Sequence, residues 1–284
     1  MTDGLVIVDK PAGITSHDVV SRVRRLAGTR KVGHAGTLDP MATGVLVLGI
    51  NRATRLLGHL TLTDKAYSGT ICLGVATSTD DAEGEVVSRA ETDALTETAI
   101  RSGLAAMVGN IQQRPSSVSA IKIDGRRAYD RVRSGEQVEL PTRSVRIDAI
   151  DVVGIEGALV DIDVRCSSGT YIRAIARDLG EALGVGGHLT RLRRTQVGPF
   201  GIGQSRTLEE LADEFAVVPI AEAAAATFPS VVLEEAEATA VGYGRPLQRR
   251  LADDAEVALF DASGRFLALY RNEGEKARPV AVFL

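Results

Sequence analysis

The stretch GHAGTLDPMATGVLVLG, from Gly33 to Gly49, places a carboxylate in a glycine-rich loop directly before an apolar run. Residues 45–50 are apolar enough to form a buried strand. An Asp-Pro pair is by itself a common turn, because Asp bonds to nearby backbone and the residue before Pro avoids the helical region. The surrounding glycines, however, let backbone approach a ligand. A polar loop that leads into a rigid strand is typical of a functional site, so Asp39 is a candidate catalytic residue.

The length of 284 residues and the 44% hydrophobic content indicate a globular protein with one large domain, or a large domain with a small second one. No apolar run reaches membrane-spanning length. The first residues, MTDGLVIVDKP, lack the basic and apolar pattern of a signal peptide and favour an early strand. These features predict a cytoplasmic protein that does not act at a membrane.

Cysteines and histidines give no sign of a metal or disulfide framework. Cys72 and Cys166 lie in strand-like apolar contexts without a CxxC spacing, which predicts buried, reduced side chains. The four histidines match no zinc-ligand spacing. The acidic segment TSTDDAEGE, residues 77–85, lacks the Asp-x-Asp-x-Asp-Gly frame of a calcium loop. We predict no metal site, and an exposed loop at 77–85.

The charge is distributed unevenly along the chain. The formal net charge is -4, but residues 207–284 alone hold 7 basic and 14 acidic side chains. Basic residues cluster at 22–31, 126–133 and 189–196. Such clusters are either solvated faces or local surfaces that contact the phosphates of a nucleic acid. The candidate phosphate contacts are Arg22, Arg25, Arg126 and Arg127.

Periodicity and turn residues predict the order of elements. A strand at 4–8 precedes a helix that Thr15 or Ser16 caps and Gly28 ends. The elements expected further along are a strand at 67–75, an amphipathic helix at 92–109, antiparallel strands within 144–166 around a turn at 156–157, a helix at 171–183, a strand beginning at 188 and an Ala-rich helix at 207–226.

Strands and helices alternate without a regular βαβ rhythm, which favours an α+β fold with a mixed, mainly antiparallel sheet. Residues 112–143 carry an excess of basic side chains with Pro and Gly and are expected to run over the surface. A boundary is expected at Phe228-Pro229, followed by a small β-rich domain with a hairpin around 263–264. The expected domains are therefore 1–228 and 229–284.

Four segments, taken in order, resemble the TruB family of tRNA pseudouridine synthases over residues 4 to about 200: DKPAGITSHDVV, GHAGTLDPMATGVLVLG, DKAYSGTICLG and SSGTYIRAIARDLG. The resemblance implies a pseudouridine synthase fold and isomerisation of the T-loop uridine at position 55 of tRNA. The bond between C1′ and N1 breaks and the ring is rejoined through C5. The resemblance implies no cofactor, because no electrons leave and no group is brought in.

The resemblance also implies catalytic roles. Asp39 matches the nucleophilic aspartate, Arg173 its arginine partner and Tyr67 the tyrosine that stacks on the target uracil. An enclosed carboxylate tends to take up a proton unless a cation keeps it charged, which is the part expected of Arg173. The target base must leave its stack before these groups can reach it.

Other residues take supporting or RNA-binding roles by the same resemblance. His34 stacks into the place that the flipped base leaves, Leu192 lines the uracil pocket, and residues 171–173 offer backbone groups to the base edge, with Tyr171 among the substrate-binding residues. Lys10 supports the active-site loop and is grouped with the RNA-binding residues. The 112–143 excursion corresponds to an RNA-gripping loop. Residues 229–284 correspond to a PUA-like RNA-binding domain, although their excess of acid departs from that role.

Three hypotheses follow for function. The first is a monomeric, stand-alone tRNA pseudouridine synthase that binds the T-arm, with tRNA folding as an additional activity. The alternatives are the catalytic subunit of a guide-RNA particle and a non-catalytic tRNA-binding chaperone. The basic excursion favours direct binding of tRNA without a protein partner. Attack on the uracil ring and a glycal route at the ribose both stay open.

Overall fold

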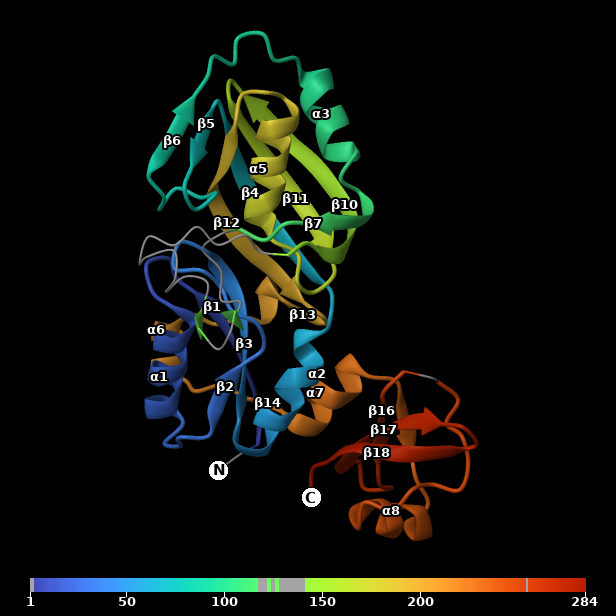
Figure 1. Cartoon of the computed structure of the whole chain (residues 1–284). Helices are drawn as coiled ribbons and strands as arrows, with labels where there is room; N and C mark the ends of the chain where they lie inside the picture. Colours follow the sequence, from blue (N-terminus) through green and yellow to red (C-terminus); the bar gives the residue numbers. More distant parts are fainter. Residues whose placement is uncertain (1–2, 117–121, 124–125, 128–140, 254) are drawn as a thin grey trace.

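The computed structural model describes residues 3–116, 141–253 and 255–284, and the backbone of residues 122–123 and 126–127 (Figure 1). A ten-stranded sheet forms its centre. Its strands are β1 (Gly4–Lys10), β2 (Val32–His34), β3 (Thr43–Ile50), β4 (Lys65–Leu73), β7 (Gly109–Gln113), β10 (Arg143–Glu156), β11 (Leu159–Cys166), β12 (Gly187–Val197), β13 (Phe200–Gly201) and β14 (Val218–Pro219).

The main path of this sheet runs β14-β1-β3-β12-β4-β11-β10-β7, with β2 beside β3 and β13 beside β12. The pair β3 and β12 is parallel, and the other neighbours along the path are antiparallel. The predicted mixed, mainly antiparallel sheet is therefore confirmed. The parallel pair matters for function, because it brings the segment after Asp39 against β12 through register partners Thr43 and Arg193.

Helices cover the sheet and the remaining strands form smaller sheets. The helices are α1 (Ser16–Leu26), α2 (Leu57–Thr61), α3 (Glu97–Ala105), α5 (Ile172–Ala182), α6 (Leu208–Asp213), α7 (Ile220–Thr227) and α8 (Glu235–Gly242), with 3-10 turns at Asn51–Leu56 and Ile202–Gln204. The smaller sheets are β5 (Val75–Thr77) with β6 (Val86–Arg89), β8 (Lys122–Ile123) with β9 (Arg126–Arg127), and β15 (Ser230–Val232), β16 (Val257–Phe260), β17 (Phe266–Glu273) and β18 (Lys276–Val282).

Both faces of the central strands β1 and β3 are buried. Since side chains alternate between the faces of a sheet, neighbouring residues of these strands belong to two different cores. Val6 and Leu46 join the core under α1, α3 and α5. Leu5 and Val45 face the opposite core, which α7 and the C-terminal strands cover. This explains why 45–50 forms an almost continuous apolar run, as a strand buried on both faces requires.

Helix α1 follows the predicted capping. The Thr15 side chain accepts from the Asp18 backbone N–H and Asp18 accepts from the Thr15 N–H, which completes a capping box. Gly28, after the helix, takes a φ of 61°. The strands at 144–166, the helix at 171–183 and the strand from 188 are also confirmed, with shifts of a few residues at their ends.

Two predicted helices differ from the structure: one is shorter and the other is divided. The expected helix at 92–109 spans only Glu97–Ala105, because Thr96 caps it by accepting from the Ala99 N–H. The expected helix at 207–226 is wrong as one element and consists of α6 and α7 separated by β14. There Val218 and Pro219 pair with β1 at the edge of the sheet, and Pro cannot continue a helix.

The C-terminal strands form a sheet of order β15-β16-β17-β18, with α8 beside it. The predicted hairpin is present, with Gly264 at a φ of 82° between β16 and β17. Phe260, Phe266 and Phe283 extend from this sheet into the core beneath β1 and β3. No helix of the described residues is long and apolar enough to cross a membrane.

Candidate active site

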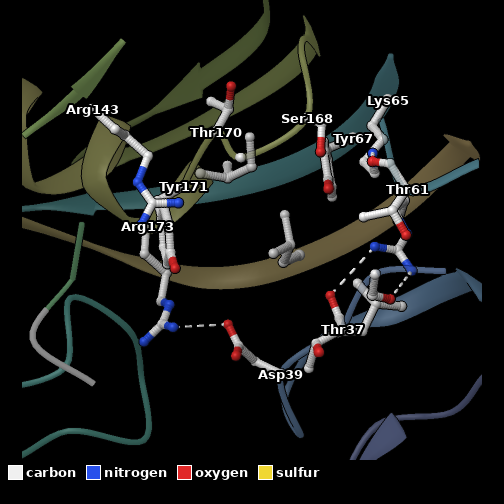
Figure 2. Close-up of a pocket in the computed structure, with 16 residues that line it drawn as sticks. Thr37, Asp39, Thr61, Lys65, Tyr67, Arg143, Ser168, Thr170, Tyr171 and Arg173 are labelled. Atoms are coloured by element: carbon white, nitrogen blue, oxygen red, sulfur yellow. Dashed lines mark hydrogen bonds and ion pairs between the residues drawn. The ribbon is translucent and has the colours of Figure 1, made fainter. Parts of the chain in front are cut away.

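Three of the four segments that carry the TruB resemblance, those with Asp39, Tyr67 and Arg173, meet at a cavity of about 250 Å³ beside the central sheet (Figure 2). The loop before β3, strand β4, the turn before α5 and strand β12 each contribute to it. Its lining consists of Gly36, Thr37, Leu38, Asp39, Thr61, Lys65, Tyr67, Arg143, Ser168, Gly169, Thr170, Tyr171, Ile172, Arg173, Leu192 and Arg194. Sequence reasoning named Asp39, Tyr67, Tyr171, Arg173 and Leu192 among them.

Asp39 and Arg173 contact each other at the wall of this cavity (Figure 2). The Arg173 Nη2 lies 3.0 Å from the Asp39 Oδ2. The Arg173 side chain is 5% exposed, whereas that of Asp39 is 39% exposed. The pair therefore combines a buried cation with a carboxylate that a ligand can reach.

Asp81 is a second partner of Arg173 that sequence reasoning missed. Its Oδ2 lies 3.1 Å from Arg173 Nη1, which also donates to the Thr79 carbonyl at 3.1 Å. Asp81 is 2% exposed, so the prediction of an exposed loop at 77–85 is wrong here. No local pattern separates Asp81 from its acidic neighbours, because its partner lies 92 residues further along the chain.

Burial and charge oppose each other at Asp39. Burial raises the pKa of its carboxyl, the Arg173 guanidinium lowers it, and the Asp81 charge raises it again. The net direction of the pKa is upward. The ionised nucleophile therefore depends on Arg173, which must serve two carboxylates at once.

Lys10 joins the turn after β1 to the loop that carries Asp39. Its Nζ donates to the carbonyls of Pro11 at 2.8 Å, Ile14 at 2.7 Å and Pro40 at 3.2 Å. The side chain has no exposed surface, and burial lowers the pKa of its ammonium to about 8. A fully buried side chain cannot touch RNA, so its inclusion among the RNA-binding residues is wrong and only a supporting position fits.

Arg194 is the other anchor of the loop, and sequence reasoning missed it. Its Nε donates to the Val45 carbonyl at 2.7 Å, Nη2 to Gly36 at 3.2 Å and Nη1 to Thr37 at 3.4 Å. At 1% exposure it belongs to the core rather than to a basic surface. The backbone of Arg194 packs closely against Gly44, where a Cβ would lie 2.2 Å from the Arg194 carbonyl oxygen. Gly44 also has a positive φ of 97°, which favours glycine.

The cluster at 189–196 is therefore not the basic surface that its composition suggested. Besides buried Arg194, Arg193 forms an ion pair with Asp9 at 2.6 Å. Arg191 is the exposed member. A count of charges along the sequence does not predict the charge of one surface of this strand, because alternate side chains point to opposite faces of the sheet.

Tyr67 and Leu192 form an apolar side of the cavity, each 9% exposed. Burial raises the pKa of the Tyr67 phenol, which keeps it protonated. Of the backbone groups at 171–173 that are expected to face a base, the Tyr171 N–H and carbonyl are both bonded to the Gln113 side chain. The Tyr171 ring lies under Arg143, whose guanidinium carbon is 5.2 Å from the ring centroid.

The remaining predicted residues lie outside the cavity lining. His34 is half-buried on β2, burial lowers the pKa of its ring, and its Nδ1 has no hydrogen-bond partner among the described residues. Arg22 and Arg25 are exposed on α1. The side chains of Arg126 and Arg127, and most of the 112–143 excursion, lie outside the described residues. Within the described part of the chain, no group of His, Cys, Asp or Glu could hold a metal ion.

Two solved structures share this architecture. One is described as "Crystal Structure of a Cbf5-Nop10-Gar1 Complex" and matches at 27% identity with a TM-score of 0.77, over 99% of this chain and 85% of that chain. The other, "Structure of H/ACA RNP bound to a substrate RNA containing 2'-deoxyuridine", matches at 26% identity and 0.76 over the same shares. The mixed sheet with its C-terminal β domain is that of the pseudouridine synthases, which are isomerases.

Family models refine this class. The N-terminal domain of the TruB family pseudouridylate synthases matches residues 24–172, the tRNA pseudouridylate synthase B C-terminal domain 173–228, and the tRNA Pseudouridine synthase II C-terminal domain 228–284. The chain belongs to the TruB family of pseudouridylate synthases, which confirms the resemblance.

Full-length relatives agree with the family models. A protein of Arthrobacter sp. strain FB24 named tRNA pseudouridine synthase B is 58% identical over 100% of this chain and 97% of its own length. A protein of Thermobifida fusca with the same name is 56% identical over 100% of this chain and 99% of its own length. The similarity therefore includes the C-terminal strands as well as the pocket.

Proposed function

We propose that this isomerase converts the T-loop uridine at position 55 of tRNA into pseudouridine, with Asp39 as the nucleophile. The observation that carries the proposal is the accessible Asp39 carboxylate 3.0 Å from the buried Arg173 guanidinium. The names of the relatives, tRNA pseudouridine synthase B, support tRNA as the substrate.

The pocket suits a single flipped base. Its volume of about 250 Å³ and its Tyr67 and Leu192 side offer an apolar face on which uracil can stack. Removing the base from its stack costs a few kcal/mol, which this contact and new hydrogen bonds offset.

The reaction rearranges bonds without an outside reactant. The bond from C1′ to N1 breaks, C1′ bonds to C5, the C5 proton leaves, and N1 gains a proton. Asp39 takes part as an ionised carboxylate, either on the uracil ring or at the ribose. Arg173 keeps it ionised in a cavity where burial alone would favour the protonated form.

We propose that the chain acts alone, as a monomer in the cytoplasm, on the T-arm of tRNA. Its relatives at 56–58% identity carry the name tRNA pseudouridine synthase B, while the structural neighbours at 26–27% identity are described as an RNP and as a complex of several proteins. We assign catalysis to residues 1–228 and a PUA-like role to 229–284. We assign the phosphate contacts to Arg22, Arg25, Arg126 and Arg127. His34 is proposed to stack into the space that the flipped base leaves in the T-loop.

Mass-resolved mapping of a T-arm hairpin incubated with the purified chain tests this function. We expect conversion of the T-loop uridine without any guide RNA or second protein. The matched control is a hairpin with cytidine at that position, which should stay unmodified. Conversion that requires an added guide RNA would support the guide-RNA particle instead, and absence of conversion would reject the enzyme assignment.

A further inference from the structure

The Gln113 amide, at the end of β7, makes a two-point contact with the residue before α5. Its Oε1 accepts from the Tyr171 backbone N–H at 2.8 Å, and its Nε2 donates to the Tyr171 carbonyl at 3.0 Å. Gln113 is 1% exposed. An amide has one donor side and one acceptor side, so this geometry satisfies both groups of the Tyr171 backbone.

The backbone N–H of Tyr171 requires a partner from outside α5, because the first turn of the helix offers it no acceptor. It is the N-cap of α5, with extended φ of -99° and ψ of 108°, and its side chain makes no capping hydrogen bond. In a capping box, a Glu or Gln three residues on accepts from the N-cap N–H. Here Ala174 holds that position and has no acceptor. Gln113, from a strand 58 residues earlier, supplies it.

A second contact fixes the ring of the same tyrosine. Arg143 is the cross-strand partner of Gln113 in the pair of β7 and β10. Its guanidinium carbon lies 5.2 Å from the Tyr171 ring centroid, and Figure 2 shows both side chains at the cavity wall. The two neighbouring residues thus hold the backbone and the ring of Tyr171. Two residues further along, Arg173 reaches Asp39.

We infer that Gln113 is a positioning residue of the isomerase, which fixes the first turn of α5 so that Arg173 meets Asp39. The inference rests on the proposed function. Gln113 acts through Tyr171 and does not line the cavity. Its loss should therefore slow the chemical step on bound RNA more than it weakens RNA binding.

Single-turnover kinetics on the T-arm hairpin test this role in the full chain. Gln113→Ala should lower the rate constant about ten- to hundred-fold, as displacement of a catalytic group by about 1 Å does. The dissociation constant for the hairpin should stay close to that of the wild type. Gln112→Ala is the matched control, since Gln112 is the same residue type, exposed, on the opposite face of β7.

Gln113→Glu separates positioning from a general loss of stability. A protonated carboxyl has one donor and one acceptor, as the amide has, whereas a carboxylate only accepts and repels the Tyr171 carbonyl. The variant rate divided by the wild-type rate should therefore rise as pH falls. The division cancels groups common to both proteins. The neighbouring charged side chains are Arg143, the cross-strand partner of Gln113 on β10, and Arg177 on α5, which donates to the carbonyl of Arg114.

The result for each variant distinguishes failure of the inference from failure of the proposed function. A wild-type single-turnover rate in Gln113→Ala overturns the inference and leaves the proposed function standing. If Gln113→Ala does not fold, a ratio for Gln113→Glu that stays flat with pH overturns it equally. A wild-type chain without isomerase activity overturns the proposed function, and the inference with it.

Discussion

Arg173 sets the electrostatics of the cavity, because one buried guanidinium holds two carboxylates. Asp39 lies at 3.0 Å and Asp81 at 3.1 Å, on different nitrogens. A guanidinium is planar and its donors are fixed, so a partner on one side orients it toward the other. Asp81 is therefore expected to aim Arg173 at Asp39.

Asp81→Asn should lower the rate of isomerisation about ten-fold or more, because the released guanidinium loses its orientation. Single-turnover kinetics measure this. The control is Asp80→Asn, since Asp80 pairs with Arg177 one turn further along α5, outside the cavity. Equal loss in both variants would show that any broken ion pair on α5 has the same effect, which would contradict the role of Asp81.

The raised pKa of Asp39 predicts the acid side of the pH profile. Because the carboxyl binds its proton more tightly in the folded chain than a free Asp does, activity should be lost as pH falls through a value above the pKa of a free Asp side chain. By the same linkage, ionised Asp39 lowers stability at neutral pH. Asp39→Asn should therefore melt at a higher temperature than the wild type at pH 7. A lower melting temperature would contradict the direction of the shift.

At the level of elements, α5 depends on close packing as well as on its first turn. Gly180 faces the backbone that leads into β12, and a Cβ there would lie 2.1 Å from the Gly186 carbonyl carbon. Backbone cannot move aside as a flexible side chain can. This contact sets the distance between α5 and β12, which carry Arg173 and Leu192.

Gly180→Ala should destabilise the chain by about 3 kcal/mol, the upper range for overpacking. Gly58→Ala is the matched control, because Gly58 lies in α2 with nothing within 4 Å of an added Cβ. It should stabilise by about 0.5 to 1 kcal/mol through the higher helix propensity of Ala. Denaturant unfolding measures both. Similar midpoints for the two variants would contradict the packing argument.

Local patterns predicted most elements but not their long-range partners. Capping residues placed α1, and alternation placed β10 and β11, because these signals are contained within a few residues. The pairing of β14 with β1 interrupted the expected helix at 207–226, and no nearby residue except Pro219 signals it. Asp81, Gln113 and Arg194 were missed for the same reason, since each contacts a residue far along the chain.

Across the whole molecule, charge is separated between the two ends of the chain. The last 78 residues carry twice as many acidic as basic side chains, while α1 presents Arg22 and Arg25 at the surface. The C-terminal strands are joined to the sheet by an apolar core that includes Phe266 and Phe283. RNA contacts that depend on salt are therefore expected on the catalytic part rather than on the C-terminal strands.

Arg22→Ala and Arg25→Ala should each reduce the salt dependence of tRNA binding. The slope of log K against log salt should fall by about 0.7 to 0.9 for each phosphate contact removed. Arg278→Ala is the control, because Arg278 lies in the acidic C-terminal part and pairs with Glu273. An unchanged slope for all three variants would remove α1 from the RNA-binding surface.

The most direct measurement of the central claim compares the wild type with Asp39→Asn in two assays on one tRNA: formation of pseudouridine in the T-loop by mass-resolved mapping, and equilibrium binding. We predict that the wild type converts the uridine, while Asp39→Asn binds with similar affinity and forms no product. The amide keeps the shape of the side chain and removes only its charge and nucleophilicity. Product formation by Asp39→Asn would contradict the assignment of this carboxylate as the catalytic group.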